Sequence, residues 1–302
     1  MSVSHDAQNN VVVRKPQPSS NKKRSMTGHL KLLVSVIAIT MSLFQLYTAA
    51  AGLLPPLQQR SAHLLFVLVL VFLLYPACRK SSTSKPGVLD WVLVALSLVS
   101  NAYLFWRYPS LARSGGLYVA ADYIMGGIAM LVVFEASRRV LGWPLVILAA
   151  ACLVYAFVGR WVPGPLGHCG FTLNRVLQQM YLTTEGVYGQ ILGVSATYIF
   201  LFVTFGAFLS ATGVSNFFND FAAAIAGKTR GGPAKIAVIS SALVGTVSGS
   251  TSANVVTTGT FTIPLMKRSG YESYFAAAVE AAASCGGQIM PPIMGSAAYI
   301  MA

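Results

Sequence analysis

Long apolar runs separated by short polar segments form the dominant pattern of this chain. Each run approaches the roughly 20 residues that an α-helix needs to cross the hydrocarbon core of a bilayer. The runs lie near 30–52, 61–78, 88–106, 118–136, 141–158 and 190–212. The pattern therefore predicts an all-α integral membrane protein with six conventional spans before residue 213.

Two shorter stretches have an amphipathic pattern. In 171–182 the apolar side chains fall mostly on one side of a helix, and 214–227 brings together Phe217, Phe218 and Phe221. Helices lying in the plane of the membrane would explain both stretches, and ordinary helices at loop edges are the alternative.

The composition agrees with a membrane protein, because 55% of the 302 residues are hydrophobic and only 10% are charged. Too little polar surface remains to coat a soluble domain. The net charge of +13 alone would suggest nucleic acid. However, Lys and Arg stand in short clusters between apolar runs, so we expect no nucleic-acid binding.

Residues that carry catalytic or metal chemistry are few. The four Cys and four His residues have no spacing typical of a disulfide framework or a metal site, and we expect the His residues to be solvated or interfacial. No nucleophile–base set or phosphate loop is evident. We therefore expect neither an enzyme nor a bound metal.

Charge also predicts the orientation. Residues 1–29 are polar and basic, which favours a disordered cytoplasmic tail, and 30–52 is then an uncleaved span. Small residues at 48–52 leave cleavage as an alternative. With the N-terminus inside, 16 of the 21 Lys and Arg residues fall in cytoplasmic segments. The positive-inside rule therefore favours a cytoplasmic N-terminus.

The stretch GTVSGSTSANVVTTG, residues 245–259, is rich in small polar side chains, although apolar runs flank it. The segments on either side of SGSTS, 234–247 and 253–266, are each about 14 residues, or roughly 21 Å of helix, which is short for a full crossing. Basic residues stand beyond both runs: Lys228, Arg230 and Lys235 before the stretch, and Lys267 and Arg268 after it. Because both flanks favour the cytoplasm, we predict a re-entrant helical hairpin over 233–266 with its tip near 248–252.

The tip of such a hairpin cannot complete its helical hydrogen bonds. It is tolerated at membrane depth only where protein or a polar cavity satisfies it. Its carbonyls and hydroxyls are then available to a small cation, and the returning half-helix presents its N-terminus to an anionic group. Tight packing of helices through small residues is the alternative explanation.

Glycine and proline pairs interrupt the apolar run that follows, over 271–302. Gly286, Gly287, Pro291 and Pro292 come after about four helical turns and predict a discontinuous transmembrane helix. A kinked helix without a site is the alternative. A hairpin tip followed by a broken helix is typical of a transport site near the membrane midplane.

One carboxylate lies within these elements. Glu280 is a functional candidate by default, and an ion pair or hydrogen bond with the end of a neighbouring helix is the alternative. Glu135 is spaced to meet Arg138 and Arg139 on its own helix. Two further carboxylates lie near span ends, where we expect them to be interfacial: Asp90 and Asp122.

Three motifs in the second half of the chain closely resemble the fused permeases of tripartite ATP-independent periplasmic (TRAP) transporters, of the TAXI-type branch. They are LTTEGVYGQILGVSATYIFLFVTFGAFL, RGGPAKIAVISSALVGTVSGSTSANVVTTGTFTIPLMKRSGY and EAAASCGGQIMPPIMG. The resemblance covers about 183–302, whereas 30–160 resembles the small-subunit-like region of the family in span number and hydropathy.

The resemblance implies a secondary importer in the bacterial cytoplasmic (inner) membrane. It takes a carboxylate-bearing solute from an extracytoplasmic solute-binding protein and uses an ion gradient, usually sodium, without another cofactor. It also implies an elevator-type movement in which a domain with two hairpins carries the solute.

Mapped onto this chain, the resemblance places solute- and ion-binding residues in two sets. The hairpin set is Ser248, Gly249, Ser250, Thr251, Ser252, Asn254, Thr257 and Thr258. The broken-helix set is Gly286, Gly287, Gln288, Pro291 and Pro292, with Glu280 as a possible intramembrane carboxylate. The sequence departs from the family pattern in two places. After Gly-Ser, GSTSAN has polar residues where small apolar residues are commoner, and Cys285 stands where Thr is frequent.

The expected organisation is a tail (1–29), a small-subunit-like membrane region (30–160), an extracytoplasmic or interfacial connector (161–189) and the first part of a large-permease transport region (190–302). The family continues into a second inverted half. We therefore expect an N-terminal portion with an incomplete second inverted repeat, whose C-terminal half is missing. A non-transporting membrane scaffold or anchor and an inactive permease fragment are the alternatives.

Overall fold

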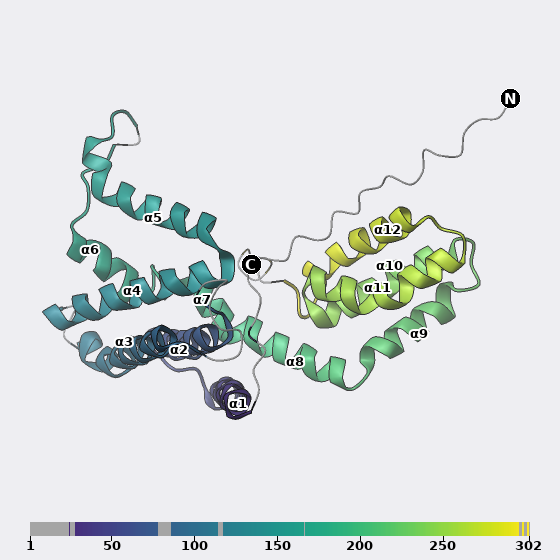
Figure 1. The fold of residues 1–302 in the computed structure, drawn as a ribbon, viewed down its shortest axis with the longest axis horizontal. Helices are drawn as coiled ribbons and strands as arrows, with labels where there is room; N and C mark the ends of the chain where they lie inside the picture. The colour runs from purple at the N-terminus through teal and green to yellow at the C-terminus, as the bar shows by residue number, and fades with distance from the viewer. Residues whose placement is uncertain are drawn as a thin grey trace.

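The structure is a computed structural model that describes residues 24, 28–77, 86–113, 117–165, 167–295, 298 and 301. Throughout these residues every regular element is a helix, which confirms the all-α fold class. Figure 1 shows two groups of helices, with α8 (Phe200–Ala211) lying between them. The predicted tail falls almost entirely outside the described residues.

The first group contains most of the conventional spans. Its helices are α1 (His29–Ala51), α2 (Pro56–Leu74), α3 (Val88–Arg113), α4 (Ala120–Leu141), α5 (Trp143–Val158) and the short α6 (Leu173–Leu177). The core forms where α2 packs against α3 and α4, and it buries Phe72, Leu104 and Val132. These helices are apolar around most of their circumference, as expected for helices with lipid on one side and protein on the other.

Five helical segments in the described part of the chain are long and apolar enough to cross a membrane: His29–Ala51, Pro56–Leu74, Val88–Arg113, Trp143–Trp161 and Gln190–Leu209. They coincide with five of the six predicted spans. The remaining predicted span, 118–136, falls within α4, which has 22 residues and carries charged side chains at both ends. That α4 crosses the membrane stays a prediction.

Asp90 is buried within the protein in the first turn of α3, and that it lies at the level of the membrane interface stays a prediction. Its two carboxylate oxygens each lie 2.6 Å from a guanidinium nitrogen, one of Arg24 and one of Arg139. Both arginines are also buried. Glu135 joins this cluster through Arg138 and Arg139, which confirms the predicted pairing. Burial is possible here because each charge has a partner of opposite sign.

Asp122 and His63 are likewise buried, so His63 is not solvated; that either residue lies at the level of the membrane interface stays a prediction. Asp122 accepts hydrogen bonds from the Tyr103 hydroxyl (2.7 Å) and from the Val119 amide at the start of α4 (2.9 Å). The Nδ1 atom of His63 lies 2.8 Å from the side-chain nitrogen of Gln45 on α1. Local sequence did not indicate Tyr103 or Gln45 as partners, because they come from other helices.

The two amphipathic stretches form helices. The first comprises α6 and the π-helical turn Gln178–Leu182, and it packs against α4 with Tyr181 against Gly126. The second is α9 (Val214–Ala226), in which the rings of Phe217 and Phe221 stack with centroids 6.0 Å apart. That either helix lies in the plane of the membrane stays a prediction.

The second group is built around α10. Its helices are α9, α10 (Gly232–Ser248), α11 (Thr251–Arg268) and α12 (Ser273–Cys285), and α10 contacts the other three. The connection from the first group runs through α7 (Gln190–Val194), the π-helical turn Ser195–Ile199 and α8. Figure 1 shows α10 and α11 as neighbouring helices joined by a tight turn.

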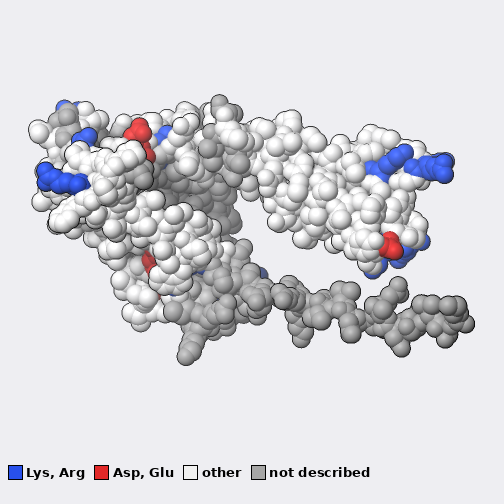
Figure 2. Space-filling view, turned by 90° about the horizontal axis from the view of Figure 1, so that it is seen from above, with Lys and Arg blue, Asp and Glu red and all other residues white. Residues whose placement is uncertain are grey.

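Lys and Arg gather at the far ends of the molecule in Figure 2, and the described surface between them is mostly neutral. At the end formed by the second group, Lys228 and Arg230 precede α10, and Lys267 and Arg268 close α11. Because α10 and α11 run in opposite directions, both basic clusters lie at the open end of the hairpin. This arrangement is the one that the re-entrant interpretation requires.

Candidate functional site

The turn between α10 and α11 consists of two residues within the predicted tip. Gly249 ends α10 with φ of +57°, in the left-handed region that glycine adopts without strain. Ser250 then caps α11, and its hydroxyl oxygen accepts a hydrogen bond from the amide of Ala253 (3.4 Å). The small polar sequence of the tip is therefore explained partly by the needs of the turn itself.

The predicted break in the last helix begins where α12 ends, at Cys285. Gly286–Gln288 form a single 3₁₀ turn, called η4. The chain then folds back, so that the amide of Gly295 donates to the carbonyl oxygen of Gln288 at 2.6 Å. Any helix beyond this loop lies almost entirely outside the described residues.

The hairpin and the broken segment are in direct backbone contact. A Cβ atom on Gly245 would lie 2.7 Å from the Cα of Gly287, and one on Gly249 would lie 2.3 Å from the carbonyl oxygen of Met294. Both distances are too short for any side chain. The structure therefore brings Ser248, Gly249, Asn254 and Gly287 of the two predicted sets to one place.

Asn254 is fully buried at this junction. Its amide nitrogen donates to the carbonyl oxygen of Ser241 (2.8 Å) and lies 3.0 Å from the Ser241 hydroxyl. The Oδ1 atom of Asn254 and the hydroxyl of Ser248 are buried, and neither has a hydrogen-bond partner among the described residues. Leaving such groups unpaired costs about 1–3 kcal/mol each. These two buried oxygens are thus available to coordinate a cation or to accept a hydrogen bond from a ligand.

Glu280 is also fully buried, and it is surrounded by hydroxyl groups. Its carboxylate contacts the hydroxyls of Thr258 and Thr262 on α11, and the hydroxyl of Ser284 lies 3.2 Å away. Among the described side chains Glu280 is hydrogen-bonded to hydroxyls in the middle of a neighbouring helix and makes no ion pair. Whether it also takes part in binding stays a prediction. Hydroxyl donors can partly compensate a buried carboxylate.

The hydroxyl groups of Ser241 and Ser284 lie 3.0 Å apart and connect the two buried clusters. A continuous polar network therefore runs from Asn254 to Glu280 through the interior of the second group. Sequence reasoning missed Ser241, Thr262 and Ser284. A detectable signal was present in α11, because Asn254, Thr258 and Thr262 recur every four residues and so share one face of the helix.

Other members of the predicted sets lie apart from the buried junction. Ser252, Gln288, Pro291 and Pro292 are exposed in this structure. The hydroxyl of Thr257 donates to the carbonyl oxygen of Ala253 in its own helix (2.9 Å). Thr251 and Gly286 are partly buried beside the site. Any part these residues play in binding stays a prediction.

Apolar helices together with a polar helical hairpin packed against a broken helix are typical of membrane transport permeases. The fold and the site therefore place the protein in this class. The family model of the tripartite ATP-independent periplasmic transporter, DctM component, matches residues 128–302, and the chain belongs to this family. The matched residues include the whole of the second group of helices. They begin within α4, so they overlap the end of the region 30–160, which we expected to be similar to the small subunit of the family.

Several characterised permeases are similar to the chain. A C4-dicarboxylate TRAP transporter large permease of Pseudomonas aeruginosa is 38% identical over 101 residues, which are 33% of this chain and 24% of that protein. An isethionate TRAP transporter permease of Oleidesulfovibrio alaskensis is 36% identical over 91 residues, 30% of this chain and 14% of that protein. A C4-dicarboxylate permease of Vibrio cholerae is 28% identical over 173 residues, 57% of this chain and 35% of that protein.

The chain thus covers about a quarter of the length of the P. aeruginosa relative. No solved structure matches it. The family places the protein among transport permeases rather than enzymes.

Proposed function

We propose that the chain is the membrane permease component of a binding-protein-dependent importer that is driven by an ion gradient. The observation that carries this proposal is the direct contact of α10 with η4, and of the hairpin turn with Met294 beyond it, beside two unpaired buried oxygens. A scaffold that only packs helices has no need of unpaired acceptors at its core, because each reduces its stability.

The solute is proposed to be a small carboxylate taken from an extracytoplasmic solute-binding protein. Two of the similar permeases are named for C4-dicarboxylates and one for isethionate, which supports a small organic anion. The N-terminus of α11 begins at the hairpin turn, and helix N-termini favour anionic groups. Because the chain covers about a quarter of its P. aeruginosa relative, transport is proposed for it together with the further permease sequence that such relatives contain.

Sodium is the coupling ion that we propose. The available atoms are oxygens, the Oδ1 atom of Asn254 and the Oγ atom of Ser248, which are hard ligands suited to a small cation. Carbonyl groups freed where α10 and α12 end would complete such a site. We further propose the TAXI-type branch, an elevator-type movement of the second group, and a multi-pass location in the inner membrane with a cytoplasmic N-terminus.

The proposal is tested by uptake of radiolabelled succinate and isethionate into membrane vesicles from cells that express the protein from its own gene, with its solute-binding protein added. We expect uptake of one probe that stops when an inward sodium gradient is replaced by potassium. Ser250→Leu or Asn254→Leu abolishes it, since each places a branched apolar group at the turn or in the buried cluster. Thr260→Leu, on the exposed side of α11, serves as the matched control.

Two outcomes contradict the proposal. One is uptake of neither probe while the protein is present in the membrane. The other is sodium-driven uptake that both Ser250→Leu and Asn254→Leu leave unchanged, which would move the site away from the hairpin.

A further inference from the structure

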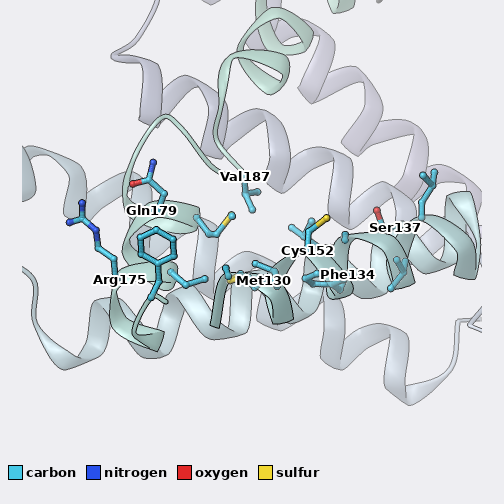
Figure 3. A pocket seen from close by; sticks show the side chains of 16 residues that line it. Met130, Phe134, Ser137, Cys152, Arg175, Gln179 and Val187 are labelled. Carbon is cyan, nitrogen blue, oxygen red and sulfur yellow. The ribbon is translucent and has the colours of Figure 1, made fainter. Parts of the chain in front are cut away.

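A cavity of about 720 Å³ lies in the first group of helices, far from the hairpin. It opens between α4 and α5, and α6 with its π-helical turn closes one side. Figure 3 shows Ser137 near one end and Arg175 with Gln179 near the other. None of the residues that line it belongs to the predicted transport site.

The walls of the cavity are those of a site for a hydrocarbon chain. Twelve of its sixteen lining residues are apolar, and only Ser137, Cys152, Arg175 and Gln179 are not. Helix α5 buries none of its residues, although it is long and apolar enough to cross a membrane together with the turn that follows it. Its apolar side chains therefore need an apolar neighbour in the space between α5 and α4.

The dimensions of the cavity fit one acyl chain. On α5 the lining runs from Leu145 to Ala156, which is about 16 Å of helix at roughly 1.5 Å per residue. That length is about half of the roughly 30 Å hydrocarbon core, the depth that one leaflet occupies. An acyl chain lying along α5 would thus run parallel to the acyl chains of the neighbouring lipids in the bilayer.

One charged side chain, that of Arg175, lines the polar end of the cavity. The segment 159–182 contains Arg160 and Arg175 and has no Asp or Glu. The guanidinium of Arg175 makes no ion pair within the described part of the chain. In Figure 3 the side chains of Arg175 and Gln179 extend at the rim rather than into the cavity. The guanidinium of Arg175 and the amide of Gln179 at the rim of the cavity are suited to bind a phosphate.

We propose that this cavity binds a phospholipid, with its phosphate on Arg175 and an acyl chain between α4 and α5. The lipid supplies the apolar surface that α5 does not receive from protein, and so holds α5 against α4. The charge at one end and the length of the apolar walls together favour a phospholipid as the occupant.

The test measures phospholipid bound to the purified, detergent-solubilised protein by native mass spectrometry, with palmitoyl-oleoyl phosphatidylglycerol added as the probe. Ala149→Phe fills the cavity from α5, and Ala150→Phe places the same ring on the same helix outside the lining. Arg175→Ala removes the guanidinium, and Arg113→Ala removes an exposed arginine at the end of α3.

We expect one phospholipid on the wild-type protein, none on Ala149→Phe and one on Ala150→Phe. Arg175→Ala weakens the binding by about fivefold, as expected for one lost cation near a lipid phosphate, whereas Arg113→Ala has no effect. Labelling of the cavity thiol Cys152 by N-ethylmaleimide slows when the lipid is added, relative to the distant exposed Cys285. Equal lipid on the two phenylalanine variants, or no lipid on any protein, overturns the proposal; the second result would indicate that polypeptide fills the space.

Discussion

Asn254 is a buried side chain that has a hydrogen-bond partner on only one half of its amide. Its amide nitrogen is fixed by two contacts with Ser241, so the side chain has one orientation. That orientation directs Oδ1 to a position without a donor. An asparagine needed only for stability would have both halves of its amide satisfied.

The contribution of Glu280 to stability can be tested with two variants of similar size, of which one removes both side-chain oxygens and the other keeps one. The hydroxyls of Thr258 and Thr262 also lie within 3.0 Å of the carbonyl oxygens four residues earlier, so each has a second acceptor. Glu280→Leu removes the shared acceptor and lowers the free energy of unfolding by about 1–3 kcal/mol. Glu280→Gln keeps one acceptor and loses less than half of that amount. Urea unfolding in detergent micelles measures both, and no loss of stability in Glu280→Leu would show that the polar network contributes nothing to the free energy of unfolding.

Asp90 in the first group of helices is a buried charge with two ion-pair partners. Asp90→Asn leaves the buried guanidinium groups of Arg24 and Arg139 without their carboxylate. We expect the free energy of unfolding to fall by about 3–5 kcal/mol, the usual result of removing one partner of a buried ion pair. Asp220→Asn, an exposed change on α9, should leave it unaltered in the same thermal unfolding assay. A loss below 1 kcal/mol for Asp90→Asn would contradict the burial of this cluster.

At the scale of elements, the contact between α10 and η4 decides the geometry of the site. It depends on glycine at Gly245, where there is no room for a Cβ atom, and a Cβ atom on Gly287 would lie in tight contact with the Asn254 amide nitrogen at 3.1 Å. The neighbouring Gly286 differs, because a Cβ atom there would have nothing within 4 Å. The two adjacent glycines thus differ in how much space surrounds them, and the sequence alone does not distinguish the two positions.

This difference provides a matched pair of variants. Gly245→Ala forces α10 and η4 apart and should lower the free energy of unfolding by about 1–3 kcal/mol, with loss of sodium-dependent uptake. Gly286→Ala should retain both stability and uptake. Thermal unfolding and vesicle uptake measure the pair, and similar results for the two variants would mean that the backbone contact is absent from the working protein.

The helices were predictable because the signal for them is local. Apolar runs of about 20 residues placed five spans, and the small polar stretch at 248–252 located the hairpin turn within two residues. Side-chain partners were less accessible to sequence reasoning. Asp90 meets Arg24 and Arg139 across 66 and 49 residues, and the Nε2 atom of His63 lies near Ser195 across 132 residues. Such contacts depend on how helices pack, which the periodicity of one helix does not specify.

On the scale of the whole molecule, the two groups of helices differ in character. The first has a large apolar core between α2, α3 and α4, whereas the second has small apolar clusters and a continuous polar network. Helix α8 contacts α1 in the first group and α10 in the second. A rigid apolar support and a polar unit connected by one helix suit the elevator-type movement that we propose, in which the second group carries the solute.

The central claim is that the junction of the hairpin with η4 binds sodium, and equilibrium binding of ²²Na⁺ to the purified protein tests it most directly. The account predicts saturable binding to the wild-type protein and to Thr260→Ala, and loss of that binding in Asn254→Ala, which removes the unpaired oxygen. Absence of saturable binding to the folded wild-type protein, or binding that Asn254→Ala leaves intact, would contradict it.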